Sequence, residues 1–509
     1  MRHIAWLDDE IETLKPLITL LEQTGDYKVY AFSNPKEFID FLKDRRQYIE
    51  AIILDEHIGF ESGLEIYDQL REELGVNIPV IFVTQEENAD YIKELIARGV
   101  QHYISKPVKF SNLLAAVTQI VEGNVLREAH RVTKIPKQFR KVYSLMESAN
   151  SVSEWRAVLG ELVKSEALIG QDLFNDLYDS AQAQFFKFFV NQYKTFVEAR
   201  DSLLVVTFLD RYSEFLEHNT LVIVVDNFSL WIWEMIKNDV NLPKEWEIYK
   251  DEFLISLLPS VTQYSRQSLL SGFFPIEMRE MGLWIDELDD GVKTKYEPEL
   301  IKLGFQKKGL PQPEIIYFTG ENSYALLKVA KGTIILIVPS FDQFVHITTD
   351  HKSLKAMFLN LTDFAEVVRI SFTRGIISKI LSEATNRFRY IMICSDHGST
   401  FVNKPVYVLG RHFMPLNPRY KYGEDFRVES DDFVAFFKDP IALKLPIPKH
   451  FKVYFAGKDR FFVRKQGNYK GVIAKFKGSL QHGGISLEEI FIPVVVLRKK
   501  NLEPWKCLK

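Results

Sequence analysis

Short apolar runs alternate with amphipathic segments through residues 1–123, and this alternation limits the folds open to that part of the chain. The short runs fit buried strands, whereas the segments between them carry apolar residues at helical spacing. The strand-like runs read IAWL, KVYAF, AIILD, PVIFVT and HYISK. Five strands separated by helices predict a parallel, doubly wound α/β sheet. In such a sheet the loops at the carboxyl ends of the strands gather at one edge, where sites form.

Polar residues stand where these strands end. Asp8 and Asp9 follow the first run, Asp55 ends the third, Thr84 ends the fourth and Lys106 follows the fifth. We therefore expect all five at one edge of the sheet. Three clustered carboxylates need a divalent cation, and Mg²⁺ suits their hard oxygen ligands. Asp55 can then attack a phosphoryl donor, while Mg²⁺ and Lys106 neutralise the aspartyl phosphate and Thr84 hydrogen-bonds to a phosphoryl oxygen.

This constellation resembles the receiver domain of bacterial response regulators over essentially all of residues 1–123. The resemblance implies a flavodoxin-like (CheY-like) fold, phosphorylation of Asp55 by a cognate sensor histidine kinase, and Mg²⁺ held by Asp8, Asp9 and Asp55. It also implies that Thr84, Tyr103 and Lys106 carry the switch, with Tyr103 swinging inward as the threonine moves. A cis peptide bond between Lys106 and Pro107 is a further expectation.

The rest of the chain changes character twice. Residues 124–205 have helical spacing with few strand signals, and they predict a helical bundle that links a sensor to an effector. An aromatic stretch within it is expected to form the inner face of that bundle, with a partner-binding face as the alternative: Phe185, Phe186, Phe188, Phe189 and Tyr193. Alternation of strands and helices returns in 206–509, which predicts a second α/β domain.

Composition excludes several classes of protein. The chain of 509 residues has a net charge of -4, so it has no bulk basic field for nucleic acid, and no compact helix-turn-helix unit follows residue 123. Its two cysteines, Cys394 and Cys507, cannot form a disulfide framework. No apolar run is long enough to span a membrane. We therefore expect a soluble cytoplasmic protein without membrane insertion or direct DNA binding.

Acidic, histidine and threonine residues recur through 206–509 in an order typical of a binuclear metal site. Three Asp, three His and one hydroxyl suffice to bind two zinc ions with a nucleophile between them. Histidine is scarce in this chain, with 11 in all, so its place in DHG and HGG segments is informative. In chain order the candidate ligands are Asp226, Thr262, Asp342, His346, Asp396, His397 and His482.

Each candidate has a local reason for its place. Asp226 ends the strand-like run LVIVVD, and Asp396 follows the run RYIMICS. Thr262 stands in a polar turn before a predicted helix, whose amide groups and dipole favour an anion. A metal would lower the pKa of the threonine hydroxyl and make it a nucleophile. Asp342 and His346 are four residues apart, so they share one side if that segment is helical.

The order D…T…DxxxH…DHG…HGG resembles the alkaline phosphatase superfamily, in particular its PglZ-type branch. The resemblance implies that one zinc is held by Asp226, Thr262, Asp396 and His397, and the other by Asp342, His346 and His482. It also implies that Thr262 attacks phosphorus and forms a phospho-threonine, which is then hydrolysed. Mixed carboxylate and imidazole ligands suit zinc, with manganese as the alternative.

Two further predictions concern bound phosphate groups. Arg266, one helical turn after Thr262, could reach a phosphoryl oxygen, or it could face solvent. A segment predicted to form loops near the site offers cations for the extra phosphates of a nucleotide-type substrate, unless they are only solvated charges: Arg411, Arg419, Lys421 and Arg427. The resemblance favours phosphodiesters over monoesters as substrates, because superfamily members with strong monoesterase activity usually have dedicated phosphate-binding arginines or extra metal ligands, which the motifs of this sequence do not identify.

The whole chain, divided as 1–123, 124–205 and 206–509, resembles PorX-type response regulators, which are associated with the type IX secretion system of Bacteroidota. The resemblance implies a phosphorylation-gated, zinc-dependent phosphodiesterase. A second hypothesis is a regulator that acts by contact with a sigma factor or secretion component, with a structural or vestigial metal site. A third and weaker hypothesis is a DNA-binding regulator. Phosphorylation is expected to favour a homodimer that forms through the receiver, and the helical segment is expected to transmit the change at that interface.

Overall fold

The structure is a computed structural model, and it describes most of residues 2–500. The residues outside the description are 1, 26, 46–47, 60, 77, 85–94, 96–97, 99, 101, 107, 109, 123–136, 167, 170, 287–291, 330, 357, 359, 385–386, 411–414, 466, 468 and 501–509. The chain divides into two compact units, Met1–Ala183 and Gln184–Lys509. The division falls inside the long helix α9 (Gln171–Ala199).

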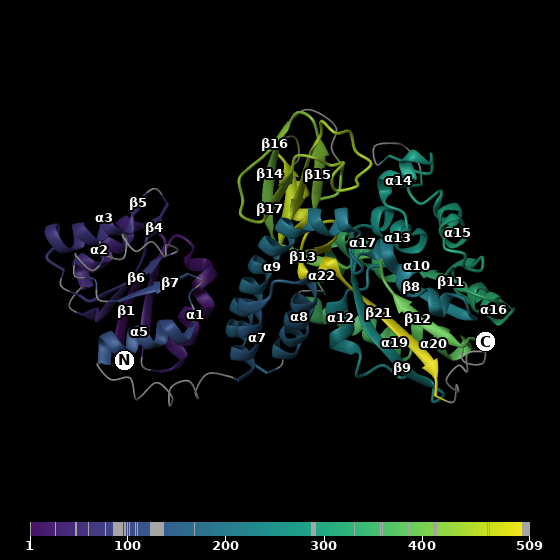
Figure 1. Cartoon of the computed structure of the whole chain (residues 1–509), viewed down its shortest axis with the longest axis horizontal. Coiled ribbons are helices and arrows are strands. Elements are labelled where there is room, and N and C mark those ends of the chain that lie inside the picture. Colours follow the sequence, from purple (N-terminus) through teal and green to yellow (C-terminus); the bar gives the residue numbers. More distant parts are fainter. Residues whose placement is uncertain are drawn as a thin grey trace. The chain divides into compact units, whose positions relative to one another are not determined.

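The first unit contains the predicted parallel sheet (Figure 1). Its strand order is β2-β1-β3-β6-β7. Its strands are β1 (Arg2–Leu7), β2 (Tyr27–Phe32), β3 (Ala51–Asp55), β6 (Val80–Thr84) and β7 (His102–Ser105), and every pairing among them is parallel. The five strands that the sequence predicts are therefore confirmed. A short hairpin of β4 (His57–Ile58) and β5 (Glu61–Ser62) follows β3.

Helices cover both faces of this sheet because alternate strand residues point to opposite sides. Trp6 and Ile53 belong to the core on one face, and Leu54 and Phe82 belong to the core on the other. The helical segments are α1 (Ile11–Gln23), α2 (Pro35–Arg45), α3 (Gly63–Asp68) with a π-helical turn (Gln69–Glu73), and α5 (Phe110–Glu122).

Three helices follow the sheet, α7 (Lys137–Ser148), α8 (Val152–Glu166) and α9. The aromatic face of α9 is mostly buried, and it packs within the second unit instead of inside a separate bundle. The Phe185 ring lies 5.5 Å from that of Phe491, and Phe186 lies against Gly457, where an added Cβ would come within 2.3 Å of it. The prediction that these aromatic residues form the inner face of a helical bundle is therefore wrong. Periodicity identifies which face of a helix is buried, but it does not identify the segment that the face packs against.

A six-stranded sheet in the order β10-β11-β8-β12-β21-β9 forms the centre of the second unit. The pairings among β10, β11, β8 and β12 are parallel, whereas β21 pairs antiparallel with both of its neighbours, β12 and β9. The strands are β8 (Thr220–Val225), β9 (Trp246–Ile255), β10 (Glu314–Tyr317), β11 (Ile334–Val338), β12 (Tyr390–Cys394) and β21 (Phe491–Lys499). Buried Val and Ile residues fill β8, β11 and β12, as expected for strands covered on both faces.

Helices surround this sheet, and two of them carry candidate site residues (Figure 1). They are α13 (Thr262–Ser271) and α17 (Ser340–Asp350). The others are a 3-10 turn (Val205–Thr207), α10 (Phe208–Arg211), α11 (Ser213–Leu216), α12 (Leu230–Ile236), α14 (Pro275–Glu280), α15 (Glu297–Lys307), α16 (Glu321–Val329), α18 (Lys352–Lys355), α19 (Leu361–Thr373), α20 (Ile376–Ala384), α21 (Tyr469–Phe476) and α22 (Leu487–Ile490).

The segment predicted as loops forms much of a small β lobe, drawn in yellow-green in Figure 1. Its sheets have the orders β13-β20, β16-β14-β19 and β15-β18-β17. The strands are β13 (Thr400–Val402), β14 (Lys404–Gly410), β15 (Tyr420–Gly423), β16 (Phe426–Val428), β17 (Val434–Phe437), β18 (Lys452–Ala456), β19 (Arg460–Arg464) and β20 (Ser479–Gln481). The prediction of loops is wrong because interspersed Gly, Pro and charged residues hide the period-2 pattern of these short strands.

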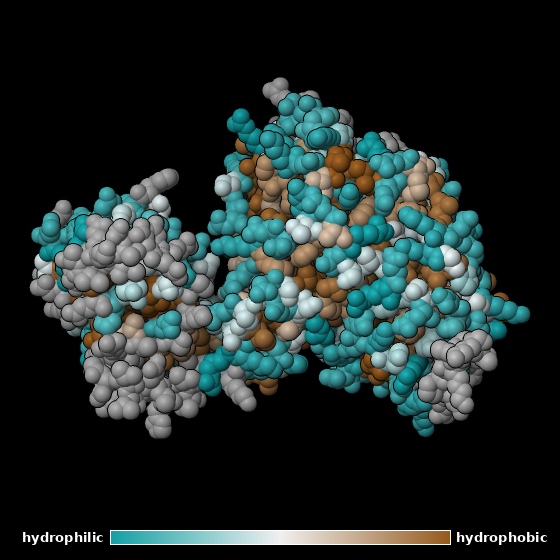
Figure 2. All heavy atoms as spheres, in the orientation of Figure 1, coloured by the Kyte–Doolittle hydropathy of each residue, from teal (hydrophilic) through white to brown (hydrophobic). Residues whose placement is uncertain are grey.

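Hydrophilic side chains predominate on the face shown in Figure 2, with smaller hydrophobic areas between them. Among the described residues, no helix is both long and apolar enough to cross a membrane.

Candidate metal centre

Three neighbouring strands of the central sheet deliver most of the candidate ligands to one edge. The strands are adjacent in the order β11-β8-β12 and run parallel, so their carboxyl ends adjoin. Asp226 directly follows β8, and Asp396 and His397 follow β12. Asp342 and His346 lie in α17, which begins two residues after β11 ends. Asp342 and His346 therefore share a helix, as their spacing requires.

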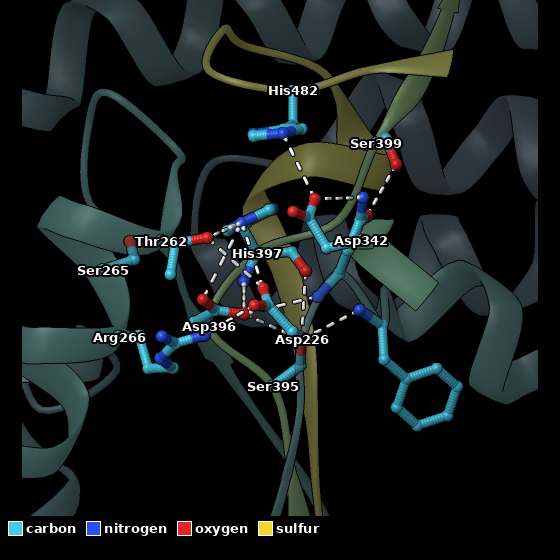
Figure 3. Close-up of polar contacts among 12 residues, drawn as sticks. Asp226, Thr262, Ser265, Arg266, Asp342, Ser395, Asp396, His397, Ser399 and His482 are labelled. Carbon is cyan, nitrogen blue, oxygen red and sulfur yellow. Dashed lines mark hydrogen bonds and ion pairs between the residues drawn. The ribbon is translucent and has the colours of Figure 1, made fainter. Parts of the chain in front are cut away.

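One group of candidate ligands surrounds the hydroxyl of Thr262, the first residue of α13. The Thr262 Oγ1 lies 3.2 Å from His397 Nε2 and 3.4 Å from Asp226 Oδ1. His397 Nε2 in turn lies 3.6 Å from Asp226 Oδ1 and 3.7 Å from Asp396 Oδ2. Figure 3 shows these side chains pointing toward one another. The three side chains Asp226, Asp396 and His397 are close enough to share one cation.

The second group forms around Asp342. Its two carboxylate oxygens lie 3.2 Å from His346 Nε2 and 3.3 Å from His482 Nε2. The His482 ring stacks on His397 with 4.3 Å between centroids, which brings the two groups together. Asp342, His397 and His482 are again close enough to share one cation. His346 is the exposed member of the group, and the others are buried or half-buried.

The chemistry of the buried atoms fits bound metal ions. Among the described side chains, Asp396 Oδ2 and His482 Nδ1 are buried with no hydrogen-bond partner. Burial and the neighbouring Asp396 raise the pKa of Asp226 to about 8, and burial raises the pKa of Asp396 to about 6. Burial lowers the pKa of His397 to about 4, which keeps the imidazole neutral, as a metal ligand must be. A divalent cation would relieve the crowding of these carboxylates.

The Asp342 carboxyl behaves differently from the other two acids. Burial alone would raise its pKa, but His482 and the hydrogen bonds from His346 and His482 outweigh burial and hold the pKa well below the usual range. Asp342 is therefore an anion that two imidazoles already surround. Carboxylate and imidazole together make a ligand set that suits zinc.

Arg266 is not free to face solvent. It is 5% exposed, and its Nη1 donates to Asp226 Oδ2 at 2.5 Å while its Nε donates to Glu297 Oε1 at 2.9 Å. Glu297 also accepts a hydrogen bond from the hydroxyl of Tyr317 at 2.8 Å. The guanidinium therefore orients Asp226, and the prediction that it contacts a phosphoryl oxygen stays a prediction. Glu297 and Tyr317 were missed because no local pattern marks them.

Two of the four cations predicted to bind substrate phosphates are buried and paired with groups of the protein itself. Arg419 is 0% exposed and forms a two-armed ion pair with the Glu489 carboxylate, at 3.0 and 2.6 Å. The Lys421 ammonium donates to the carbonyl groups of Pro415 and Asn417. The prediction that Arg419 and Lys421 meet substrate phosphates is therefore wrong. Arg427 is exposed, and Arg411 lies outside the described residues.

A separate acidic site occupies the edge of the first unit's sheet. Asp8, Asp9 and Asp55 are close enough to share one cation. The Lys106 ammonium donates to Asp55 Oδ2 at 2.8 Å and lies 3.5 Å from Asp8 Oδ2. Burial and the adjacent Asp55 raise the pKa of Asp8 to about 6, and burial raises the pKa of Asp55. As at the other centre, clustered carboxylates favour a bound divalent cation, here Mg²⁺ by its preference for oxygen ligands; Asp8 and Asp55 are buried and Asp9 is exposed.

Two of the residues predicted to act as the switch lie near this site. The Thr84 hydroxyl donates to the carboxylate of Glu56, a buried residue that the sequence did not single out. Tyr103 is 48% exposed, so its ring faces outward. Pro107 lies outside the described residues, and the predicted cis bond before it stays a prediction. The described segments contain a cis bond at Leu258–Pro259.

Comparison with protein families finds two matches along the chain. A family model described as "BREX system PglZ alkaline phosphatase-like domain" matches residues 212–497. A second, described as "Response regulator receiver domain", matches residues 4–118. The two matches coincide with the two sites described above.

Curated relatives match only part of the chain. The nisin biosynthesis regulatory protein NisR of Lactococcus lactis subsp. lactis is 26% identical over 204 residues, which cover 36% of this chain and 84% of NisR. The response regulator protein TodT of Pseudomonas putida is 31% identical over 111 residues, 22% of this chain and 47% of TodT. The two-component response regulator EHD1 of Oryza sativa subsp. indica is 26% identical over 111 residues, 22% of this chain and 32% of EHD1. The chain thus spans about a third of EHD1 and about half of TodT.

Solved structures similar to this chain include receiver domains. One is a CheY-like response regulator receiver domain protein from Methanospirillum hungatei JF-1, with 18% identity, a TM-score of 0.22, and coverage of 26% of this chain and 99% of that chain. Another is a response regulator receiver domain protein from Clostridium thermocellum, with 22% identity, a TM-score of 0.22, and coverage of 26% of this chain and 98% of that chain.

Proposed function

The chain belongs to the PglZ alkaline phosphatase-like family and carries a response regulator receiver domain, and on that premise we propose that it is a phosphorylation-controlled, zinc-dependent phosphodiesterase. Asp55 accepts the phosphoryl group from a cognate sensor kinase, with Mg²⁺ held by Asp8, Asp9 and Asp55. The proposal includes a receiver at 1–123, a helical segment at 124–205 and a PglZ-type domain at 206–509. It also includes a role in regulating type IX secretion.

One observation carries the enzymatic proposal: the Thr262 hydroxyl stands at the start of α13, within 3.4 Å of both Asp226 and His397. A hydroxyl in this place has the Asp226 oxygen and the His397 imidazole as possible acceptors for its proton. The N-terminus of the ten-residue α13 adds a favourable potential for a phosphoryl anion. These contacts support Thr262 as the nucleophile.

The ligand assignment follows the two groups. We assign Asp226, Thr262, Asp396 and His397 to one zinc ion, and Asp342, His346 and His482 to the other. The bound ions would lower the pKa of the Thr262 hydroxyl and offset the charge that develops on the phosphoryl oxygens. Cys394 is a buried free thiol, and the few cysteines support a function in the reducing cytoplasm.

The reaction of the chain's own residues has two steps. Thr262 Oγ1 attacks phosphorus and its proton passes to an acceptor in the site. The bond from phosphorus to one ester oxygen breaks, and that group leaves as an alcohol with a proton from the site, so that a phospho-threonine that still carries the second ester group forms. Water then attacks the same phosphorus, the bond to Oγ1 breaks, and a phosphate monoester is released. Arg266 contributes by holding the Asp226 carboxylate in place, because it pairs with both Asp226 and Glu297.

A diester is favoured over a monoester by the charges near the nucleophile. A monoester dianion carries one more negative charge than a diester, and its binding profits from an additional free cation. The nearby Arg266 is instead paired with two buried carboxylates. The proposal includes nucleotide-type diesters as substrates. Of the four cations predicted to contact further phosphates, Arg427 is described by the structure and exposed, so it is the one we propose for this role.

The test is hydrolysis of bis(p-nitrophenyl) phosphate by the full chain. Wild type, Thr262→Ala and a chelated sample are compared at equal concentration, with zinc content measured for each. Thr373→Ala is the matched control, because Thr373 caps its own helix by donating to the Arg369 carbonyl at 2.9 Å. We expect activity only where both zinc and Thr262 are present, and full activity in the control.

Two other outcomes of this experiment would contradict parts of the proposal. Wild-type activity in a zinc-loaded Thr262→Ala protein would overturn the role of Thr262. No activity in a fully zinc-loaded wild type, combined with intact signalling by Thr262→Ala in cells, would favour the regulator that acts by contact with a sigma factor or secretion component.

A further inference from the structure

Asn227 directly follows Asp226 and contacts a carboxylate in each ligand group. Its backbone N–H points to Asp396 Oδ1 at 3.4 Å, and its side-chain Nδ2 donates to Asp342 Oδ1 at 3.2 Å. The residue is 1% exposed. A single residue thus touches the Asp396 that we assign to one zinc and the Asp342 that we assign to the other.

The orientation of the Asn227 amide is fixed from the other side. Ser399 Oγ donates to Asn227 Oδ1 at 2.6 Å, so the oxygen of the amide is engaged and the nitrogen faces Asp342. The labelled side chains of Ser399 and Asp342 lie close to each other in Figure 3. Ser399 follows β12 in the same segment as Asp396 and His397, so the contact also ties that segment to the end of β8.

The backbone at Asn227 is left-handed, with φ at 64°. Asparagine tolerates this region better than most residues with a side chain, and glycine tolerates it best. The left-handed turn lets consecutive groups of one residue, the backbone N–H and the side-chain amide, reach two different carboxylates. Sequence reasoning passed over Asn227 because Asp226 already explained the polar end of the strand.

The Asn227 amide is electrically neutral, and this neutrality matters as much as its position. With metal ions bound, Asp226, Asp342 and Asp396 would act as carboxylate ligands around one small volume. Arg266 already pairs with Asp226, and a further cationic side chain there would compete with the metal ions. An amide N–H stabilises a carboxylate without adding charge. It can therefore hold Asp342 in the ligating position and leave the second oxygen and the electrostatic potential to the metal.

We propose that Asn227 is a positioning residue that sets the geometry of both ligand groups, and that its side-chain amide is required for tight zinc binding by Asp342, His346 and His482. The proposal rests on the proposed two-zinc site. Removal of a partner that orients a metal ligand typically weakens metal binding by roughly 10–100-fold. We expect a loss of this size for the zinc at Asp342, and a smaller loss for the zinc at Asp226, because the backbone N–H of residue 227 survives substitution.

The experiment is a chelator-competition titration of zinc on the full chain, with stoichiometry from elemental analysis. Asn227→Gly removes the amide and keeps the left-handed backbone accessible, so it isolates the side chain. Asn227→Ala removes the same amide and adds backbone strain. Asn403→Gly, at an exposed position in the lobe, is the matched control for the substitution. Melting curves in excess chelator show whether each variant folds.

The expected result is two tight zinc ions in wild type and in the control, and one tight and one weakened ion in Asn227→Gly. Two ions of wild-type affinity in a folded Asn227→Gly protein would overturn the inference. If that variant does not fold, Ser399→Ala decides: it keeps Asn227 but frees its amide to rotate, so wild-type affinity there would also overturn it. A wild type that binds no zinc would refute the proposed function itself, which separates the two failures.

Discussion

The buried pair of Arg419 and Glu489 gives the most demanding test of how the lobe is joined to the central sheet. Neither side chain has any solvent exposure, and the guanidinium donates twice to the carboxylate, at 3.0 and 2.6 Å. Glu489 Oε1 accepts a third hydrogen bond from the Gly484 N–H at 2.9 Å, next to the loop that carries His482. The Glu489→Gln substitution keeps the shape of the side chain and removes its charge.

The cost of this substitution follows from the burial. Breaking a fully buried ion pair by removing one partner's charge lowers the free energy of unfolding by about 3–5 kcal/mol, because the remaining buried charge is neither paired nor solvated. Gln keeps one acceptor for Arg419, so the lower end, about 3 kcal/mol, is expected. A domain of roughly 290 residues has an unfolding entropy near 0.6 kcal/mol/K at about 2.1 cal/mol/K per residue, so the melting temperature should fall by about 5 °C.

The assay is calorimetric melting of the full chain, with the transition of the PglZ-type domain followed in excess chelator so that zinc does not contribute. Glu366→Gln is the control, since Glu366 pairs with Arg369 on the surface, where both side chains are about half exposed. The control should shift melting by less than about 1 °C, as surface pairs contribute little. A Glu489→Gln protein that melts within 1 °C of wild type would refute the burial argument.

Three further predictions concern the receiver and the free thiol. Beryllofluoride, which mimics the phosphoryl group on Asp55, should raise the mass of the chain to that of a dimer in light scattering, and Asp55→Ala should stay unchanged; equal masses for treated and untreated wild type would reject the dimer. Glu56→Ala releases the Thr84 hydroxyl from its resting hydrogen bond, so acetyl phosphate should phosphorylate the variant faster than wild type, and equal rates would count against Glu56 as a restraint. Burial raises the pKa of the Cys394 thiol, so a Cys507→Ser protein should resist iodoacetamide when native and react when unfolded; labelling of the native state would contradict the buried position.

The sequence allowed the parts of the site that depend on local rules to be predicted. Residues that end parallel strands must lie at one edge of a sheet, which correctly brings Asp226 near Asp396. Helical spacing puts Asp342 and His346 on one side of α17. These inferences need only the strand order and the period of a helix, both of which a single sequence encodes.

Partners that are far apart along the chain could not be predicted in the same way. Glu297 meets Arg266 from 31 residues away, and Glu489 meets Arg419 from 70 residues away. Each of these charges, considered alone, is typical of a solvated surface, because Lys, Arg, Asp and Glu are mostly exposed. Only tertiary packing makes them buried pairs, so an interpretation from sequence assigned both Arg419 and Arg266 either to substrate or to solvent.

The aromatic face of α9 shows how packing can bear on regulation. The Leu258 N–H donates to the Tyr193 hydroxyl at 2.7 Å, and Leu258 is four residues before Thr262. Between them, Ser260 donates to the Gly484 carbonyl at 3.0 Å and accepts from the Gly483 N–H at 3.1 Å. The segment 258–262 is thus bonded to α9 on one side and to the loop after His482 on the other.

Helix α9 itself begins in the first compact unit and ends in the second, and it is continuous across the division. A shift of α9 along or around its axis would therefore act on the segment that carries the candidate nucleophile and, through Ser260, on the loop that carries a ligand of the second group. Coupling of this kind needs a packed, hydrogen-bonded element with two positions, not a change at the metal ligands themselves. A different position of Tyr193 would therefore change the alignment of Thr262 with Asp226 and His397 without any change at those two residues.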